Sequence, residues 1–210
     1  MKIAIDGTAA SGKGTLSNLL SKSLKLPRLD TGLLYRKVAF LYIKSVGLMA
    51  SKNTLNNSIL KKILIDLDLN DLEQDTLKHD LYGNLASMIG KLGFVRNKLK
   101  VIQIEFLKNM TKKNGGCILD GRDIGTKILP NADFKFYIDA PIKTRAERRF
   151  KQLCLTNKSI EFKNILLDLK KRDLSDKSRK NSPLILSKDS ILIDTEFLNP
   201  HQVLKKALYY

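Results

Sequence analysis

Short apolar runs alternate along the chain with longer stretches in which apolar residues recur every three or four positions. Residues 2–6 form the first run, and similar runs follow at 117–120, 134–138 and 190–193. Runs of this length predict buried strands, and the spacing between them predicts amphipathic helices. Strands that alternate with helices indicate an α/β fold, with a parallel β-sheet core flanked by helices.

The same periodicity places the helices. One helix follows the first strand and a glycine-rich segment, and a second begins at Thr31, its expected N-cap, and fades near Gly47. Residues 48–78 show no regular pattern. Further helices are expected over 80–113 as a pair bent near Gly90–Gly93, after Pro141, over 159–180 as two stretches, and over 199–209.

The composition is that of an ordinary globular protein. The chain has 210 residues, of which 43% are hydrophobic and 28% charged, and this length suits one domain. No apolar run approaches the ~18 residues of a membrane span, and the first residues do not form a signal peptide. Two cysteines provide no disulfide framework. We therefore expect a cytoplasmic monomer without a membrane partner.

The charge balance is unusual, because 38 basic residues against 21 acidic ones give a net charge of +17. Such an excess favours an anionic partner: a nucleotide, a nucleic acid or a membrane surface. Most of the basic residues are lysines, scattered in pairs such as Lys61–Lys62 and Lys170–Lys171, a pattern typical of a solvated surface. No nucleic-acid-binding motif accompanies them, so no dedicated nucleic-acid partner is expected.

The segment after the first strand has the spacing of a Walker A motif. Backbone N–H groups of such a loop surround the phosphates of a nucleotide, and the next helix directs the positive end of its dipole at the same anion. Lys13 can reach the β- and γ-phosphates. The residues expected to bind the nucleotide are Gly7, Thr8, Ala9, Ala10, Ser11, Gly12, Lys13, Gly14 and Thr15.

Two positions are candidates for holding Mg²⁺. The motif usually has a hydroxyl at position 14, but this chain has Gly14, so Thr15 or water must replace it. Asp120 ends an apolar strand just before Gly121, where a Walker B carboxylate would hold the metal or its water shell. Asp30, also at a predicted strand end, is a second candidate for that carboxylate.

The nine arginines are scarcer than the lysines, and their planar side chains bind phosphates and carboxylates with two hydrogen bonds. Arg36 and Arg122 follow predicted strand ends, the edge of a parallel sheet that faces a ligand. Arg145 and Arg149 lie four residues apart on one helix face and could bind one polyphosphate. Arg148 points elsewhere and suits a surface ion pair.

Four segments together resemble the bacterial cytidylate kinases. They are Ile-Asp-Gly-x-Ala-Ala-Ser-Gly-Lys-Gly-Thr at 5–15, Leu-Asp-Thr-Gly-x-x-Tyr-Arg at 29–36, Asp-Gly-Arg-Asp-Ile-Gly-Thr at 120–126 and Arg-Asp-x-x-Asp-x-x-Arg at 172–179. The first would fit any nucleoside monophosphate kinase, and the third is far more specific. The four occur in the family's order over almost the whole chain.

This resemblance implies a P-loop kinase fold that transfers the γ-phosphoryl group of ATP to CMP or dCMP, with Mg²⁺ as cofactor. It divides the single domain 1–210 into a core at about 1–47 and 94–210, an acceptor-binding insert at about 48–93 and a lid at about 145–175. The insert is shorter than in the longer family members.

The resemblance also assigns residues. It implies catalytic roles for Lys13, Arg122, Arg145 and Arg149, the last two from the lid on the ATP side. On the CMP side it implies cytosine contacts from Thr31, Arg96, Asp123 and Arg179, phosphate contacts from Arg36 and Arg122, and sugar contacts from Ser87, Arg172 and Asp176.

Two other functions stay open on the sequence. A P-loop kinase for another nucleoside monophosphate or small molecule would contain the same loop, and an assay across acceptors separates the two. A basic nucleic-acid-binding protein with a vestigial loop would lose RNA binding steeply with salt and would lack kinase activity.

Overall fold

The computed structural model describes residues 1–48, 55–68, 72, 75–155 and 160–210. The chain forms two compact units. The first consists of Met1–Leu29 and Leu107–Tyr210, and the second of Asp30–Phe106. The predicted acceptor insert at about 48–93 lies within the second unit, and the predicted lid at about 145–175 lies within the first. Residues 49–54, 69–71 and 73–74 of that insert and residues 156–159 of that lid are outside the described residues.

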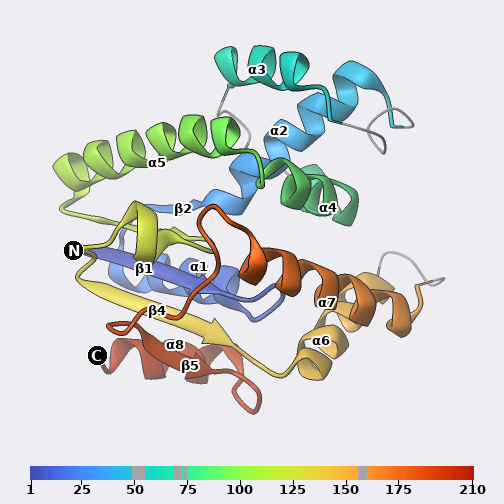
Figure 1. The fold of residues 1–210 in the computed structure, drawn as a ribbon. Helices are drawn as coiled ribbons and strands as arrows, with labels where there is room; N and C mark the ends of the chain where they lie inside the picture. Colours follow the sequence, from blue (N-terminus) through green and yellow to red (C-terminus); the bar gives the residue numbers. More distant parts are fainter. Residues whose placement is uncertain (49–54, 69–71, 73–74, 156–159) are drawn as a thin grey trace. The chain divides into compact units, whose positions relative to one another are not determined.

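The first unit is built on a five-stranded sheet in the order β2-β3-β1-β4-β5 (Figure 1). β1 pairs in parallel with β3 and β4, and β4 pairs in parallel with β5. This arrangement confirms the α/β class and the four strands predicted from the apolar runs. The strands are β1 Lys2–Gly7, β2 Arg28–Asp30, β3 Cys117–Asp120, β4 Phe134–Asp139 and β5 Ile191–Asp194.

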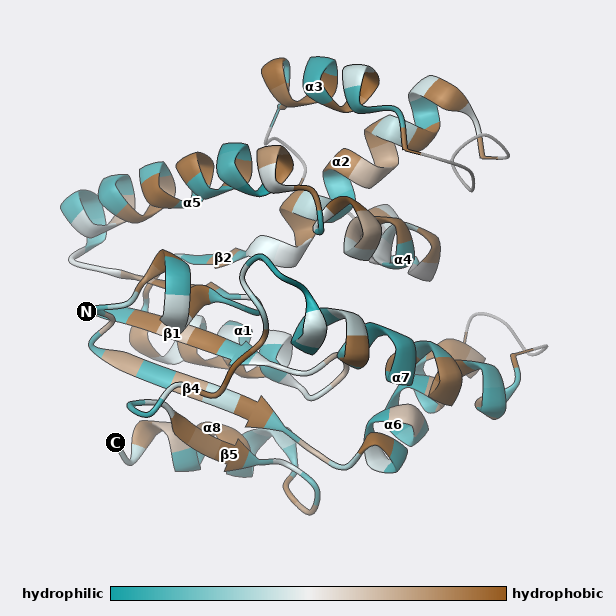
Figure 2. Cartoon of the chain, viewed as in Figure 1, coloured by the Kyte–Doolittle hydropathy of each residue, from teal (hydrophilic) through white to brown (hydrophobic). Residues whose placement is uncertain are grey.

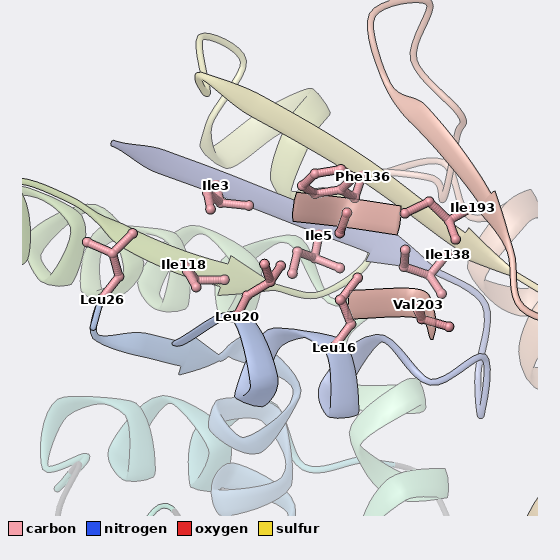
Figure 3. Packing of buried hydrophobic residues seen from close by; sticks show 11 residues of the cluster. Ile3, Ile5, Leu16, Leu20, Leu26, Ile118, Phe136, Ile138, Ile193 and Val203 are labelled. Carbon is pink, nitrogen blue, oxygen red and sulfur yellow. The ribbon is translucent and has the colours of Figure 1, made fainter. Parts of the chain in front are cut away.

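Helices α1 Lys13–Leu24 and α8 Pro200–Leu208 contribute to the main hydrophobic core of this unit (Figure 3). Successive side chains of a strand point to opposite faces, so Ile3 and Ile5 of β1 share one face. Leu16 and Leu20 of α1 lie four residues apart and pack there together. The buried cluster consists of Ile3, Ile5, Leu16, Leu20, Leu26, Ile118, Phe136, Ile138, Ile193, Val203 and Ala207.

A smaller core lies between helices α6 Ile142–Cys154 and α7 Phe162–Ser178. Ala146 of α6 and Ile165 of α7 pack there with Ala9, which belongs to the loop after β1. Figure 2 shows α7 alternating between teal and brown, as expected of an amphipathic helix. The prediction of two helical stretches here is wrong, because no glycine or proline interrupts α7.

The second unit is helical. Its helices are α2 Thr31–Val46, α3 Asn57–Ile65, the 3₁₀ turn η2 Asp75–Lys78, α4 Asp80–Ile89 and the first part of α5 Gly93–Asn114. α2 packs against α3 and α4 through buried residues such as Val38 and Tyr42. The predicted pair of helices bent near Gly90–Gly93 is confirmed. α3 and η2 lie in the stretch where the sequence showed no pattern.

The N-cap of α2 differs from the prediction. Asp30, not Thr31, is the cap, and its Oδ1 accepts the N–H of Gly32 at 2.9 Å. Aspartate is among the preferred N-cap residues because its carboxylate binds the exposed N–H groups of the first turn. Thr31 is the first helical residue and is buried.

The longest helix is α5, which has 22 residues. Lysines and other polar residues occur throughout it, and Lys112 and Lys113 lie in its last turn, where they interact favourably with the helix dipole. None of the helices in the described part of the chain is long and apolar enough to cross a membrane.

We expect Gly7→Ala to lower the free energy of unfolding by ~3 kcal/mol or more. Gly7 has a φ of +154°, and a Cβ at this position would lie 2.1 Å from the carbonyl oxygen of Ile138 on β4. That oxygen is backbone, so relief requires the strands to separate. Gly14→Ala is the matched control, since its Cβ would meet nothing within 4 Å. Equal urea midpoints for the two variants would contradict this expectation.

Candidate active site

The predicted nucleotide-binding loop joins β1 to α1. Gly12 is the N-cap of α1, with a φ of +94°, and it has no side chain to cap the helix. Ala10 also has a positive φ, +59°. The first N–H groups of α1 are thus directed to the loop's concave side without a side-chain acceptor, which suits an anion. Lys13 is buried, and its Nζ donates to the carbonyl oxygen of Thr8 at 3.2 Å.

The ends of β4 and β5 hold this loop in place. Thr8 Oγ1 donates to Asp139 Oδ1 at 2.6 Å, at the end of β4. Thr195 Oγ1, just after β5, donates to the carbonyl oxygen of Ser11 at 3.1 Å. Each contact joins residues more than 100 positions apart in the chain. The loop conformation therefore depends on the assembled sheet edge.

Arg145, one of the two predicted lid arginines, is buried at the base of α6. Its Nη1 donates to the carbonyl oxygen of Ala9 at 2.9 Å, and its Nε donates to that of Ala140 at 2.7 Å. Its Nη2 forms a 2.7 Å ion pair with Asp173 of α7. Arg145 thus links the phosphate loop to both α6 and α7.

The other two arginines of α6 differ from it in surroundings. Arg149 is half-exposed and donates to Gln152 Oε1 at 2.7 Å. Arg148, for which the sequence suggested a surface ion pair, instead donates to Thr195 Oγ1 at 2.9 Å and to the carbonyl oxygen of Glu196 at 3.2 Å. The pattern of positive charge did not reveal this contact, because Arg148 and Thr195 are 47 residues apart.

Arg148 and Thr195 also border a hollow of about 140 Å³ beside the phosphate loop. Gly12 and Thr15 form its loop side, and apolar side chains form much of the rest. Its lining consists of Ser11, Gly12, Thr15, Leu16, Arg148, Thr195, Leu198, Pro200 and Val203. A mostly apolar hollow with a few polar groups is the usual setting for a small organic ligand.

Asp120 is buried at the end of β3, as a Walker B carboxylate would be. Its Oδ2 accepts the hydroxyl of Ser17 at 2.5 Å. Helix geometry places Ser17 about 40° around α1 from Lys13, and Thr15 about 200° around. Accordingly Thr15 is exposed and faces the hollow, whereas Ser17 is buried. The sequence analysis missed Ser17, which the four-residue spacing from Lys13 could have revealed.

The donor set at Asp120 fits Mg²⁺ in the way this ion is commonly bound in kinases. Mg²⁺ prefers oxygen ligands and usually keeps several waters, with one or two carboxylates and the phosphates of the nucleotide. Asp120 and Ser17 offer a carboxylate and a hydroxyl. No group of three or more potential metal-ligating side chains occurs within the described residues, so nucleotide and water would supply the other ligands. Asp30, the second candidate, is already the N-cap of α2.

Arg122, Asp123, Asp176 and Arg179 come together in one cluster of the first unit. Arg122 Nε donates to Asp176 Oδ2 at 2.8 Å, and Arg179 lies 3.4 Å from Asp176 and 4.0 Å from Asp123. Burial alone would raise the pKa of Asp176, but the charges of Arg122 and Arg179 hold that pKa below its usual value. The carboxylate therefore stays ionised at neutral pH and fixes both arginines. Arg172 is half-buried one helical turn before Asp176.

The other predicted acceptor residues belong to the second unit. Arg36 donates from Nη1 to the carbonyl oxygens of Leu77 and His79 at 2.9 and 2.8 Å. Arg96 is buried, donates to the carbonyl oxygen of Gly90 at 3.2 Å and lies 5.5 Å from the ring centre of Tyr35. Thr31 is buried at the start of α2, and Ser87 is half-buried on α4.

The first unit also contains a buried aspartate that the sequence analysis did not single out. Asp6, the last residue before Gly7, accepts the N–H of Ile124 at 2.8 Å and that of Gly125 at 2.7 Å. Burial raises the pKa of Asp6 to about 6, although the two amide hydrogen bonds oppose that shift. A single carboxylate at a strand end has no sequence signal that distinguishes it from a turn residue.

The family model and the sequence relatives agree on one family. The family model described as cytidylate kinase matches residues 3–210. The chain is 40% identical over 205 residues to the cytidylate kinase of Bartonella bacilliformis, covering 98% of this chain and 91% of that protein. It is 38% identical over 208 residues to the cytidylate kinase of Xanthobacter autotrophicus, covering 99% and 95%.

Among solved structures, an uncharacterized protein from Eubacterium ventriosum is similar over its whole fold. The TM-score is 0.54 at 14% sequence identity, and the match covers 100% of this chain and 97% of that one. This similarity concerns the fold alone.

Proposed function

Because the chain belongs to the cytidylate kinase family, we propose that it transfers the γ-phosphoryl group of ATP to CMP and dCMP, forming ADP with CDP or dCDP. The resemblance noted in four sequence segments is confirmed by the family model, which spans nearly the whole chain. The structural observation that supports the proposal most is the ion-paired cluster of Arg122, Asp123, Asp176 and Arg179 in the same unit as the phosphate loop.

ATP is the proposed occupant of the phosphate loop. The uncapped N–H groups at the start of α1 would bind its phosphates, and Lys13 would exchange the carbonyl oxygen of Thr8 for a β- or γ-phosphate oxygen. The apolar hollow beside Thr15 and Arg148 is open to the same loop and suits the nucleoside part. Arg145 and Arg149 remain the predicted lid arginines. Arg149 is the more exposed of the two.

Mg²⁺ would be held near Asp120 and Ser17, directly or through water, with Thr15 as the predicted alternative hydroxyl. When bound, the ion neutralises charge on the phosphate oxygens. Asp120 ends β3 beside β1, the strand that leads into the phosphate loop, which supports this role for its carboxylate. Ser17 donates to that carboxylate and fixes its orientation.

Acceptor binding is proposed for the cluster at Arg122. Arg122 would bind the CMP phosphate, Asp123 and Arg179 the cytosine edge, and Arg172 and Asp176 the sugar. The equivalent predictions for Thr31, Arg36, Ser87 and Arg96 concern the second unit, and single replacements there should each raise the KM for CMP.

The transfer itself needs no general base. An ionised oxygen of the CMP phosphate attacks the γ-phosphorus, a new P–O bond forms, and the bond to the β–γ bridging oxygen breaks to release ADP. Charge in this reaction is spread over the three equatorial oxygens, so positive groups and positioning account for most of the acceleration. We expect Lys13 and Arg122 to supply this positive charge.

A coupled assay with ATP and a panel of monophosphates tests the function. We expect turnover with CMP and dCMP that exceeds turnover with UMP, AMP and GMP. A preference for AMP or for a non-nucleotide acceptor would show that the protein is a kinase but that the proposed acceptor is wrong. Absence of turnover with every acceptor, together with salt-sensitive RNA binding, would favour the nucleic-acid-binding alternative.

A further inference from the structure

The loop that contains Arg122 and Asp123 is attached to β1 at both of its ends. At the first end, the N–H of Gly121 donates to the carbonyl oxygen of Ile5 at 2.9 Å. At the second end, the N–H groups of Ile124 and Gly125 donate to the two carboxylate oxygens of Asp6. Only the two residues between these attachments, Arg122 and Asp123, are left to project from the loop.

We propose that Asp6 is a positioning residue for the acceptor, because its carboxylate holds the loop 121–125 so that Arg122 and Asp123 are directed at CMP. The inference rests on the proposed function and adds a residue to it. Asp6 is itself 5% exposed and directly precedes Gly7 of the phosphate loop. One side chain therefore sets the position of the acceptor loop relative to the start of the donor loop.

The backbone of the loop explains why such a restraint is needed. Asp123 has φ −140° and ψ 25° and is the N-cap of a short π-helix, η3 Ile124–Ile128, but its side chain forms no cap hydrogen bond. π-Helical turns are rare and occur mostly as single turns, frequently at functional sites. The Asp6 carboxylate takes the place of the missing cap by accepting two N–H groups of that turn, so Asp123 is not required as its cap.

Gly125 and Lys135 complete the surroundings of Asp6. A Cβ on Gly125 would lie 3.4 Å from Asp6 Oδ2 and 3.3 Å from Lys135 Cδ, so a side chain at this position would crowd the contact between the amide and the carboxylate. Lys135 is buried, and its Nζ forms an ion pair with Asp189. The carboxylate of Asp6 is thus committed to the two backbone N–H groups.

A merely structural role would give a different outcome from a positioning role. The phosphate loop has its own attachments, through Thr8 to Asp139, Ala9 to Arg145 and Ser11 to Thr195. Loss of the Asp6 carboxylate should therefore release the loop 121–125 and leave ATP binding intact. A structural role would instead weaken ATP and CMP use together.

The first variant is Asp6→Asn, which keeps one acceptor and turns an amide donor toward the other N–H. We expect kcat/KM for CMP to fall on the order of 10²-fold, the usual cost of misplacing a substrate by about 1 Å. The KM for CMP should rise and kcat should fall, with the Kd of ATP, measured by titration without acceptor, within about twofold of wild type. Unchanged CMP kinetics, or an equal loss of ATP affinity, would overturn the proposal.

Hydrogen exchange gives a readout that does not depend on turnover. In Asp6→Asn the amides of Ile124 and Gly125 should exchange faster, while the amides of β1 and β3 keep their protection. Wild-type protection at Ile124 and Gly125 would overturn the proposal. If the wild-type chain itself does not phosphorylate CMP, the proposed function fails, and this measurement still decides whether Asp6 holds the loop.

Two further variants control the experiment. Asp133→Asn removes a carboxylate of the same kind, which accepts the N–H of Lys2 at 2.6 Å at an exposed position, and it should leave CMP and ATP kinetics unchanged. Gly125→Ala disturbs the same contact from the loop side and is informative even if Asp6→Asn does not fold. A folded Gly125→Ala protein with lower CMP efficiency and normal ATP affinity would support the proposal. Wild-type CMP efficiency in a Gly125→Ala protein whose Ile124 amide exchanges faster would overturn it.

Discussion

Lys13→Ala is expected to lower kcat for CMP phosphorylation by at least ~10³-fold, a loss at the upper end of that measured when a single donor to a transition-state oxygen is removed. Lys13 is buried beside the phosphate loop, and Nζ now interacts with a backbone oxygen, Thr8, that a phosphate oxygen can replace. Its charge matters most when negative charge builds up on the β–γ bridging oxygen in the transition state. The loss should therefore appear in kcat as well as in KM.

The fold should survive this replacement. Lys13 is the first residue of α1, where alanine is well tolerated, and the charged hydrogen bond to Thr8 contributes only about 1.5–3 kcal/mol. Lys22→Ala, in the last turn of the same helix, is the matched control and should keep full activity. Circular dichroism and activity are measured on the same samples. Turnover close to wild type in folded Lys13→Ala protein would refute the assignment of the phosphate loop.

The parts of the fold that the sequence predicted are those whose signal is local. An apolar run such as 117–120 is buried whatever its neighbours in the fold. The glycine spacing of the phosphate loop is typical of one backbone conformation. The helices after Thr31 and Gly93 were legible because their apolar residues keep a helical period over several turns. The N-cap of α2 was misplaced by one residue because aspartate and threonine are both good caps.

The parts that the sequence could not predict depend on contacts between distant segments. Arg148 was expected at the surface because its helix position alone shows no partner, yet Thr195 and Glu196 reach it only after β5 joins the sheet. Asp6 and Ile124 are 118 positions apart, and nothing in either local pattern signals the other. Ser17 differs, since its place on the Lys13 side of α1 follows from helix geometry and could have been predicted.

Asp123→Ala is expected to have the second large effect, on recognition of the base. It should reduce the ratio of kcat/KM for CMP to that for UMP by ~10- to 10²-fold, the discrimination that a well-placed contact to a base edge usually provides. Cytosine has an exocyclic amine that donates, whereas uracil has a carbonyl in that place, so an ionised aspartate attracts the first and repels the second. Sites built around such a contact reject the wrong substrate because a buried polar group is left unpaired.

The structure supports Asp123 in this role. Asp123 is 7% exposed, its side chain does not cap the turn that follows it, and its charged neighbour Arg179 lies 4.0 Å away. The alternative is that Asp123 serves only as a partner for arginine. In that case alanine would lower kcat/KM for CMP and for UMP by the same factor, because loss of the partner would loosen an arginine that serves both acceptors.

The decisive measurement is kcat/KM for CMP and for UMP in wild type, Asp123→Ala and Asp168→Ala. Asp168 is an exposed aspartate of α7, so its variant should retain both values and shows the effect of removing one negative charge from the surface. In Asp123→Ala the CMP value should fall and the UMP value should hold or rise, with the Kd of ATP unchanged, since the phosphate loop has separate attachments. A CMP-to-UMP ratio equal to that of wild type would reject Asp123 as the residue that reads the base. The remaining candidates for that contact would then be Thr31, Arg96 and Arg179.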